Sequence, residues 1–225
     1  MSLRKIARQV GHLIEGFGKV DASNVPAIQN LLTKYSEVLT PWAEATAGRM
    51  LADVDKRDQA AWLEHAQEMS HGMRQTIRST PTGELMRSLM AEQVSLIKSL
   101  PLEAAQRVHE LTIAGLEDST RAKEIAQEIA RSGEVSASRA TLIARTEVAR
   151  TASKLTEARA QHVGCVEYIW RTAGDSTVRE SHKKMNGKVV RWDAPPTLSD
   201  GTTSHAGQIY NCRCWPEPII PDDDE

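Results

Sequence analysis

The first three quarters of the chain repeat apolar residues at helical spacing. Between residues 85 and 97 these positions recur at intervals of three, four and seven, the stripe of an amphipathic helix: Leu85, Met86, Leu89, Met90, Val94, Leu96 and Ile97. Pro101 follows the stripe, and Glu103 stands where the first turn of a new helix would carry an acidic residue. We therefore predict one helix that ends before Pro101 and another that begins after it.

Two further helical patterns precede a change in the character of the sequence. The first covers about 120–131 and is expected to end at the following Ser-Gly pair. The second is the longest pattern in the chain and covers about 136–163, because Ser136 or Ser138 can cap its start and Gly164 can stop its end.

β-Branched and aromatic residues replace the helical period after Gly164. The segment "CVEYIWRTA" predicts a strand, "STVRESHKKMN" a short helix that Gly187 ends, and "KVVRW" a second strand. The segment "IYNCRCW", residues 209–215, is expected to form a third strand.

These patterns predict a mainly α protein with two parts. Residues 1–163 should form an extended helical region of several amphipathic helices. Residues 164–225 should form a small α+β domain with a few short antiparallel strands, an aromatic core of its own and a disordered acidic tail, since three of the five tryptophans lie in this last quarter.

Composition excludes several classes of protein. The chain has 225 residues, of which 40% are hydrophobic and 26% charged, as in ordinary globular proteins. No run approaches 18 apolar residues, so no membrane span is expected. Polar residues interrupt the apolar positions near the start, which argues against a secretory signal. We expect a protein that is made and kept in a reducing cytoplasm.

The net charge of −2 gives no global electrostatic reason to bind nucleic acid, so any DNA contact must be local. The helix predicted over 136–163 carries an excess of basic residues, and four of them are candidate DNA contacts: Arg139, Arg150, Lys154 and Arg159. A solvated helix face with ion pairs to Glu147 and Glu157 explains the same residues equally well.

The candidate chemistry is concentrated after residue 164. Four side chains there form a ligand set suited to one tetrahedral structural zinc ion, the only cofactor indicated: His182, His205, Cys212 and Cys214. A domain of about 60 residues has a small hydrophobic core and marginal stability, which a bound metal ion could increase. Alternatively, both cysteines are buried strand residues, whose side chains share one face by the period of two. A disulfide between them would close a strained ring.

A catalytic interpretation of the same region is weaker. Asp175, Arg179 and His182 are four and three residues apart and would share a helix face, so Asp175 and His182 could act as an acid/base pair and a cysteine as a nucleophile. No established catalytic motif supports this. The simpler expectation is that Asp175 caps the short helix and Arg179 forms an ion pair, with Glu147 as one partner to be tested.

Three segments read together resemble the phage Mu F-like family of head morphogenesis, or minor capsid, proteins. They are "LIARTEVARTASKLTEAR", "YIWRTAGDSTVRESHKKMNGKVVRWDAPP" and "HAGQIYNCRCWPEP", and the resemblance runs from about Leu96 to Pro218. The matching motif residues, beyond the four metal candidates, are Arg145, Thr146, Glu147, Trp170, Asp175, Arg179, Gly187, Asn211 and Arg213. The resemblance implies a structural role for them and no catalytic step.

The resemblance also implies a place for the protein. Family members are non-enzymatic components of tailed bacteriophages or prophages, assembled in the host cytoplasm and held inside the head in several copies. They act in head assembly, DNA packaging or DNA ejection, so the expected partners are the portal or major capsid protein and the packaged DNA, with no membrane. Some relatives carry an appended toxin or ADP-ribosyltransferase domain, for which we expect no room here.

Two alternatives to this reading stay open. One is a metal-dependent nuclease or toxin-like enzyme built on His182, His205 and the cysteines. The other is a DNA-binding module that uses the long helix, which predicts that affinity falls steeply with salt.

Overall fold

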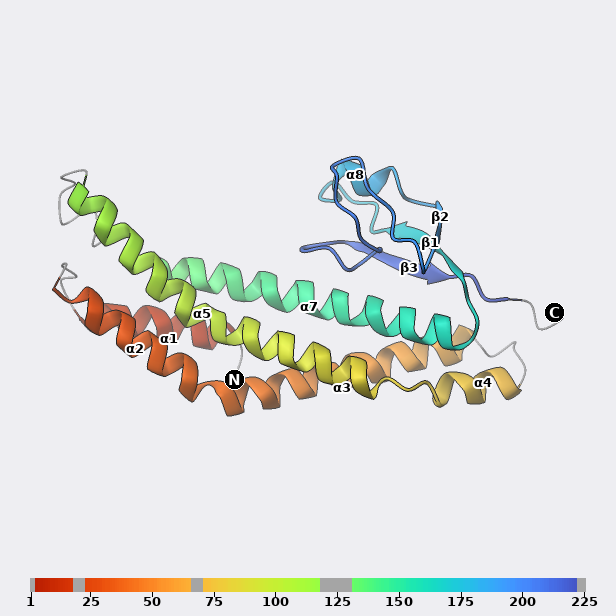
Figure 1. The fold of residues 1–225 in the computed structure, drawn as a ribbon, viewed down its shortest axis with the longest axis horizontal. Coiled ribbons are helices and arrows are strands. Elements are labelled where there is room, and N and C mark those ends of the chain that lie inside the picture. Colours follow the sequence, from red (N-terminus) through yellow and green to blue (C-terminus); the bar gives the residue numbers. More distant parts are fainter. Residues whose placement is uncertain (1–2, 18–22, 66–70, 118–130, 222–225) are drawn as a thin grey trace. The chain divides into compact units, whose positions relative to one another are not determined.

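The computed structural model describes residues 3–17, 23–65, 71–117 and 131–221 (Figure 1). It is mainly helical, with a three-stranded antiparallel sheet toward the C-terminal end, which confirms the predicted fold class. The helix predicted over 120–131 and the acidic tail lie largely outside the described residues. None of the described helices is long and apolar enough to cross a membrane.

The chain forms two compact units, and each unit joins two segments that are distant in the sequence. Unit 1 comprises 1–47 and 90–144, and unit 2 comprises 48–89 and 145–225. The longer helices are α1 (Leu3–Glu15), α2 (Val25–Val38), α3 (Thr40–His65), α4 (His71–Arg78), α5 (Gly83–Glu117) and α7 (Ser132–His162). Three of them, α3, α5 and α7, contribute residues to both units.

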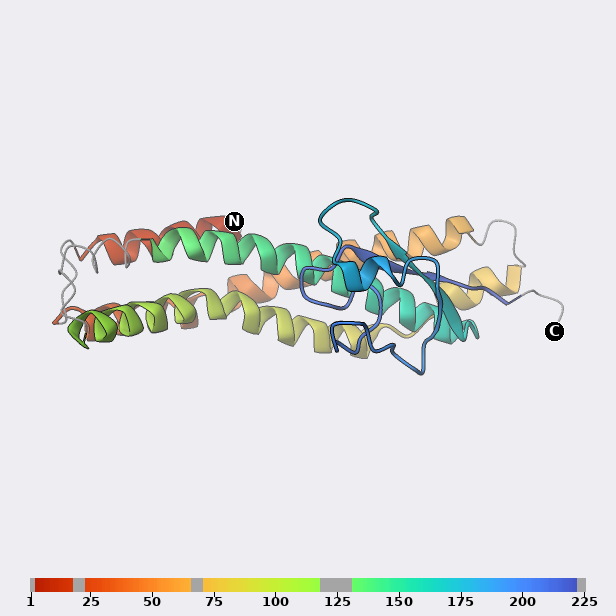
Figure 2. The same cartoon turned by 90° about the horizontal axis from the view of Figure 1, so that it is seen from above.

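Unit 1 is built from helices, which Figures 1 and 2 show as ribbons. These helices bury their apolar stripes against one another. One cluster joins α1, α2 and α5, and its members include Val10, Ile28 and Val108. A second cluster adds the starts of α3 and α7, where Ala43 and Ala140 are fully buried. The helical period of the sequence therefore predicts these faces correctly.

The expected break at Pro101 is wrong, because α5 continues through it. Proline removes one backbone donor and crowds the preceding turn, which disfavours a helix interior. Here Leu100 and Ala104 on either side are buried in the core of unit 1, and Ser36 Oγ donates to the Lys98 carbonyl at 3.1 Å. Tertiary packing outweighs the local preference.

Helix α7 begins at Ser132 rather than at the predicted Ser136. The Val135 N–H donates to the Arg131 carbonyl at 3.1 Å, so the first turn forms before either serine. The predicted stop at Gly164 is confirmed. Gly164 has φ of 84°, and the Cys165 N–H donates to the Ala160 carbonyl at 2.8 Å, as in a Schellman motif.

The sheet of unit 2 has the strand order β2-β1-β3. Its elements are β1 (Glu167–Thr172), α8 (Glu180–Lys183), β2 (Val189–Arg191) and β3 (Cys214–Pro218). The first two strands and the short helix lie where the sequence predicts them. The third strand begins five residues later than expected, at Cys214.

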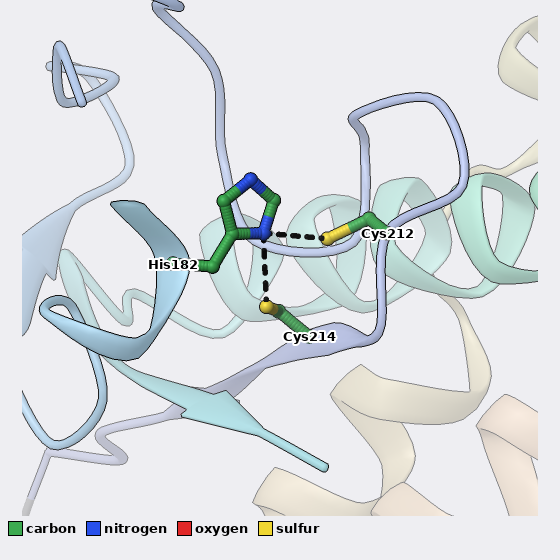
Figure 3. Close-up of side chains that lie close together, drawn as sticks. All are labelled: His182, Cys212 and Cys214. Carbon is green, nitrogen blue, oxygen red and sulfur yellow. Dashed lines mark hydrogen bonds between the residues drawn. The ribbon is translucent and has the colours of Figure 1, made fainter. Parts of the chain in front are cut away.

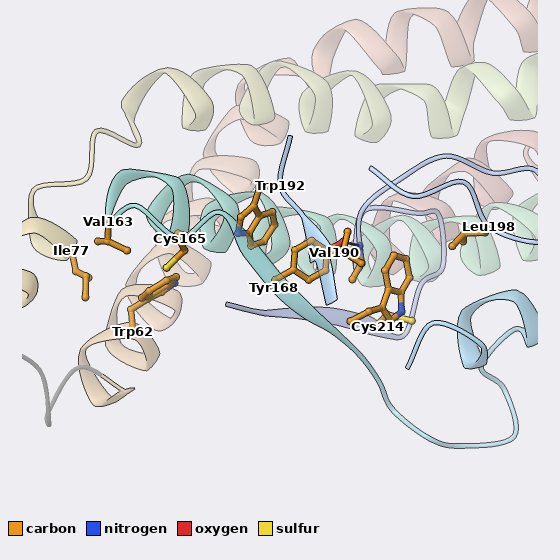
Figure 4. Packing of buried hydrophobic residues seen from close by; sticks show 12 residues of the cluster. Trp62, Ile77, Val163, Cys165, Tyr168, Val190, Trp192, Leu198 and Cys214 are labelled. Atoms are coloured by element: carbon orange, nitrogen blue, oxygen red, sulfur yellow. Dashed lines mark hydrogen bonds between the residues drawn. The ribbon is translucent and has the colours of Figure 1, made fainter. Parts of the chain in front are cut away.

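One hydrophobic cluster holds unit 2 together (Figure 4). Tyr168 and Trp170, alternate residues of β1, are fully buried in it. Trp62 of α3, Ile77 of α4 and Val163 at the end of α7 belong to the same cluster. A small three-stranded sheet with one buried face needs such a partner to be stable. The change in secondary structure at Gly164 thus falls inside one continuous core.

Candidate functional site

A histidine and two cysteines meet at the start of β3 (Figure 3). The Nδ1 atom of His182 lies 3.3 Å from Cys214 Sγ and 3.5 Å from Cys212 Sγ. One ligand atom from each residue lies within 4.8 Å of the others. His182 and Cys214 are buried and Cys212 is half-buried, so one edge of the group is accessible.

Each of the three side chains comes from a different local structure. His182 lies in α8, Cys214 is the first residue of β3, and Cys212 lies in the turn before it, where its N–H donates to the Ile209 carbonyl at 3.0 Å. Asn211 in this turn has φ of 53°, and its N–H donates to Thr146 Oγ1 at 3.1 Å. The expectation that both cysteines occupy one strand is therefore wrong, because the left-handed residue ends the extended conformation.

The loop before Cys212 packs directly on α7. Ser153 Oγ donates to the Ala206 carbonyl at 2.6 Å. Gly207 has φ of 81°, and a Cβ there would lie 2.9 Å from Ser153 Cβ and 3.1 Å from the Cys214 carbonyl oxygen. Both the positive φ and the close approach of two distant segments favour glycine at position 207. Sequence reasoning missed Ser153 and Gly207, since their contact appears only in the folded chain.

Polar contacts hold the segments around the site. Arg179 Nη2 donates to the Tyr210 carbonyl at 2.8 Å, next to the turn that carries Cys212. Arg213 Nη2 forms an ion pair with Asp175 Oδ2 at 2.5 Å. Gly187, with φ of 82°, follows α8, and its N–H donates to the Trp170 carbonyl at 2.8 Å. These motif residues position the loops.

The catalytic interpretation of Asp175 finds no geometric support. Residue Asp175 does not share a helix face with His182, because α8 begins only at Glu180. It neither caps α8 nor contacts His182; its Oδ1 accepts hydrogen bonds from Thr177, which together with Arg213 lower the pKa of Asp175. Arg179, the residue before α8, donates to a carbonyl and not to Glu147, whose carboxylate lies 3.9 Å from Arg150.

His205 is not part of the group. Its Nδ1 lies 3.1 Å from the Tyr168 hydroxyl, and its ring packs against Tyr168 and Trp192 with centroids 5.7 Å away in both cases. Of the four predicted ligands, the structure thus brings three together and places the fourth in the aromatic core. Among the described residues, no aspartate or glutamate joins the three.

The pKa values of the two cysteines of the group are shifted in opposite directions. The pKa of Cys212 is lowered to about 5, although burial opposes this. The causes are a hydrogen bond from the Cys214 thiol, the backbone N–H groups of Gly207 and Cys214, and the nearby His182. The same contact with Cys212, together with burial, raises the pKa of Cys214. Burial raises the pKa of Cys165, the third free cysteine, to about 11. These opposite shifts favour a thiolate on Cys212 over one on Cys214.

We expect selective alkylation of Cys212 in chelator-treated protein. The thiolate is the nucleophilic form, so iodoacetamide at pH 7 should modify Cys212 well before Cys165 and Cys214, and the rate should fall as the pH drops through about 5. Peptide mapping by mass spectrometry measures this. Cys212→Ser should remove the fast reaction and Cys165→Ser should keep it; equal modification of all three cysteines would contradict the assignment.

The basic residues of α7 differ in their availability for DNA. The side chain of Arg159 is not available to contact DNA, because it is buried and forms ion pairs with Asp55 and Asp58. Arg139 forms an ion pair with Glu103 at 3.2 Å, and Lys154 is half-buried.

The remaining motif residues lie on the part of α7 that belongs to unit 2. Arg145 is exposed, whereas Thr146 and Glu147 are buried. Thr146 accepts the hydrogen bond from Asn211, so it fixes the turn before Cys212.

The site lies within a region shared with a known family. Residues 106–216 match the family described as Phage Mu protein F like protein, as the sequence resemblance predicts. The chain is also 27% identical over 220 residues to an uncharacterised protein of Haemophilus influenzae, a match that covers 94% of this chain and 46% of that relative. The chain thus spans about half the length of that relative.

A second relative carries a named activity. The chain is 32% identical over 128 residues to the NAD(+)–arginine ADP-ribosyltransferase EFV of Enterococcus faecalis. This match covers 52% of the chain and 26% of the relative. No solved structure is significantly similar to the chain.

Proposed function

Because residues 106–216 belong to the Phage Mu protein F-like family, we propose that the chain is a head morphogenesis protein, a minor capsid component of a tailed bacteriophage or prophage. It works through contacts with other head proteins, the portal or the major capsid protein, during head assembly, DNA packaging or DNA ejection. Its place is the interior of the virion, after assembly in the host cytoplasm.

The family match carries the proposal, and the roles of the motif residues support it. Thr146 and Asn211 join the turn before Cys212 to α7, and Arg213 and Asp175 join β3 to the loop after β1. The polar groups of these side chains therefore bond to other parts of the same protein. Such use is typical of residues that maintain an interaction module, whereas catalytic groups must be directed at a substrate.

An enzymatic function has less support. A metal-dependent nuclease needs an activated water and a group that accepts its proton, and no carboxylate of the described residues joins His182 and the two cysteines. The named activity of the Enterococcus faecalis protein belongs to a relative of which the match covers about a quarter. We therefore propose a structural protein.

Co-expression with the portal protein and the major capsid protein of the same phage or prophage tests the proposal. We expect the chain to co-purify with the portal ring or with capsid assemblies and to be detected by mass spectrometry in purified virions. A matched control is the same expression without the portal and capsid genes. Purified components that fail to associate at micromolar concentrations, together with absence from virions, would refute it.

The same preparation addresses direct DNA binding. A protein that neutralises several phosphates loses affinity steeply as salt rises. Three of the four basic residues proposed for α7 already form ion pairs with carboxylates, namely Arg139, Arg150 and Arg159. We therefore propose that contacts with packaged DNA are secondary to protein contacts.

A further inference from the structure

We propose that His182, Cys212 and Cys214 bind one zinc ion through Nδ1 and two thiolate sulfurs, with the fourth coordination position left to water or another small ligand. The site is independent of the proposed role in the phage head. It concerns what holds the C-terminal part of unit 2 in its conformation.

The distances within the group fit a shared cation. A tetrahedral zinc ion with Zn–S of about 2.3 Å and Zn–N of about 2.0 Å places its nitrogen and sulfur ligands about 3.6 Å apart. The distances from His182 Nδ1 are 3.3 Å to Cys214 Sγ and 3.5 Å to Cys212 Sγ. One ion could therefore contact all three atoms with little movement of the side chains.

Hydrogen bonding alone accounts poorly for the same arrangement. A ring nitrogen of histidine carries either one hydrogen or one lone pair, so Nδ1 can form one good hydrogen bond. Two sulfurs nevertheless lie within reach of this single atom. A cation among the three ligands would satisfy the nitrogen and both sulfurs together.

The surroundings supply donors to the sulfurs. The indole N–H of Trp170 is buried without a hydrogen-bond partner of good geometry, and it lies close enough to Cys214 to favour a charged sulfur. Backbone N–H groups of Gly207 and Cys214 do the same for Cys212. Such donors around thiolates orient metal ligands and tune the ion that they hold.

The ligand set selects the kind of metal. Two thiolates and one imidazole suit zinc, whereas magnesium and calcium require oxygen ligands, and no carboxylate of the described chain joins the group. His205 is engaged with Tyr168, so it does not supply the fourth ligand.

The three ligands also join short segments of irregular structure to the sheet. Helix α8 has only four residues, and the turn around Asn211 is exposed. An ion bound to His182, Cys212 and Cys214 would tie α8 and this turn to the start of β3. Because an unfolded chain lacks a preformed site, the binding free energy would stabilise the fold.

The test uses the full chain, purified without a histidine tag. Elemental analysis should find one zinc ion per chain, and Co²⁺ added to chelator-treated protein should give the thiolate-to-metal absorption and the intense visible bands of a tetrahedral site. Cys212→Ser, Cys214→Ser and His182→Ala should each lose most of the bound metal. Cys165→Ser and His205→Gln are matched controls that should retain it.

Measurements on the unmodified chain keep the proposal falsifiable if a ligand variant fails to fold. Its thermal midpoint should fall on chelation and recover when zinc, but not magnesium, is restored. Folded protein that contains no zinc and takes up neither zinc nor Co²⁺ at micromolar concentrations would overturn the proposal. A disulfide between Cys212 and Cys214 in freshly purified protein, or loss of metal in His205→Gln, would overturn the three-ligand site.

Discussion

Replacing Trp170 with alanine is expected to lower the free energy of unfolding by about 3–5 kcal/mol, because the substitution removes a large apolar side chain and leaves a cavity in the core. Trp170 is fully buried in the central strand, where it pairs with Pro216 of β3. Its ring also packs edge-on against His182, with centroids 5.8 Å apart. The loss should therefore weaken both the core of unit 2 and the support of the candidate metal site.

Chemical denaturation followed by circular dichroism measures this effect. Trp215 in the neighbouring strand is the matched control, because it is 49% exposed and pairs with Arg171. Trp215→Ala should change stability by much less than Trp170→Ala, since little apolar area leaves the core. Equal losses for the two variants would contradict the proposed burial of β1.

Replacing Arg159 with alanine should cost about 3–5 kcal/mol, because it leaves the largely buried Asp58 carboxylate without its cation. Arg159 is 1% exposed; its guanidinium forms ion pairs with Asp58 and, at 2.5 Å, with Asp55. Thr156 Oγ1 donates to Asp58 at 2.5 Å. The substitution therefore removes the only charge in this set that compensates the two aspartates.

The pH dependence of this loss has a defined sign. Burial raises the pKa of Asp58, although Thr156 and Arg159 oppose it, so the folded state disfavours the ionised carboxylate. In Arg159→Ala the penalty should be largest above the pKa of Asp58. It should shrink as the pH falls through that pKa, because the protonated carboxyl carries no charge to bury.

Two variants make the comparison specific. Asp58→Asn in the Arg159→Ala background should recover part of the lost stability at neutral pH, which a double-mutant cycle measures. Arg171→Ala removes an arginine that pairs with Glu217 at the exposed face of the sheet, so it should change stability far less than Arg159→Ala does. A loss for Arg159→Ala as small as that for Arg171→Ala would show that the buried ion pairs do not hold α7 to α3.

Local sequence pattern was sufficient for most of the secondary structure. The period of 3.6 identifies the helical faces, and the positive φ of Gly164 and Gly187 agrees with the stops predicted there. The motif order after residue 142 also identified the family over most of the matched region. These features depend on neighbours a few residues away, which is the range that a sequence pattern reports.

The errors share one cause, namely contacts between distant segments. Pro101 stays helical because its neighbours are buried against other helices, and Cys212 leaves the strand because Asn211 binds Thr146, 65 residues earlier. The helical pattern suggests that Arg159 is an exposed cation, whereas in the structure it pairs with Asp55 and Asp58, about 100 residues earlier in the sequence. The spacing of residues along the sequence does not indicate which distant residues form such pairs.

The sequence by itself determined the fold class, the position of the sheet segment and the residue types of a soft-metal ligand set. The tertiary structure alone decided that His182, Cys212 and Cys214 meet while His205 does not, and that helices before residue 90 complete the core around the sheet. The physical reason is that periodicity and turn chemistry act locally along the chain. Burial of apolar area and charge pairing act through space, and they select which distant segments come together.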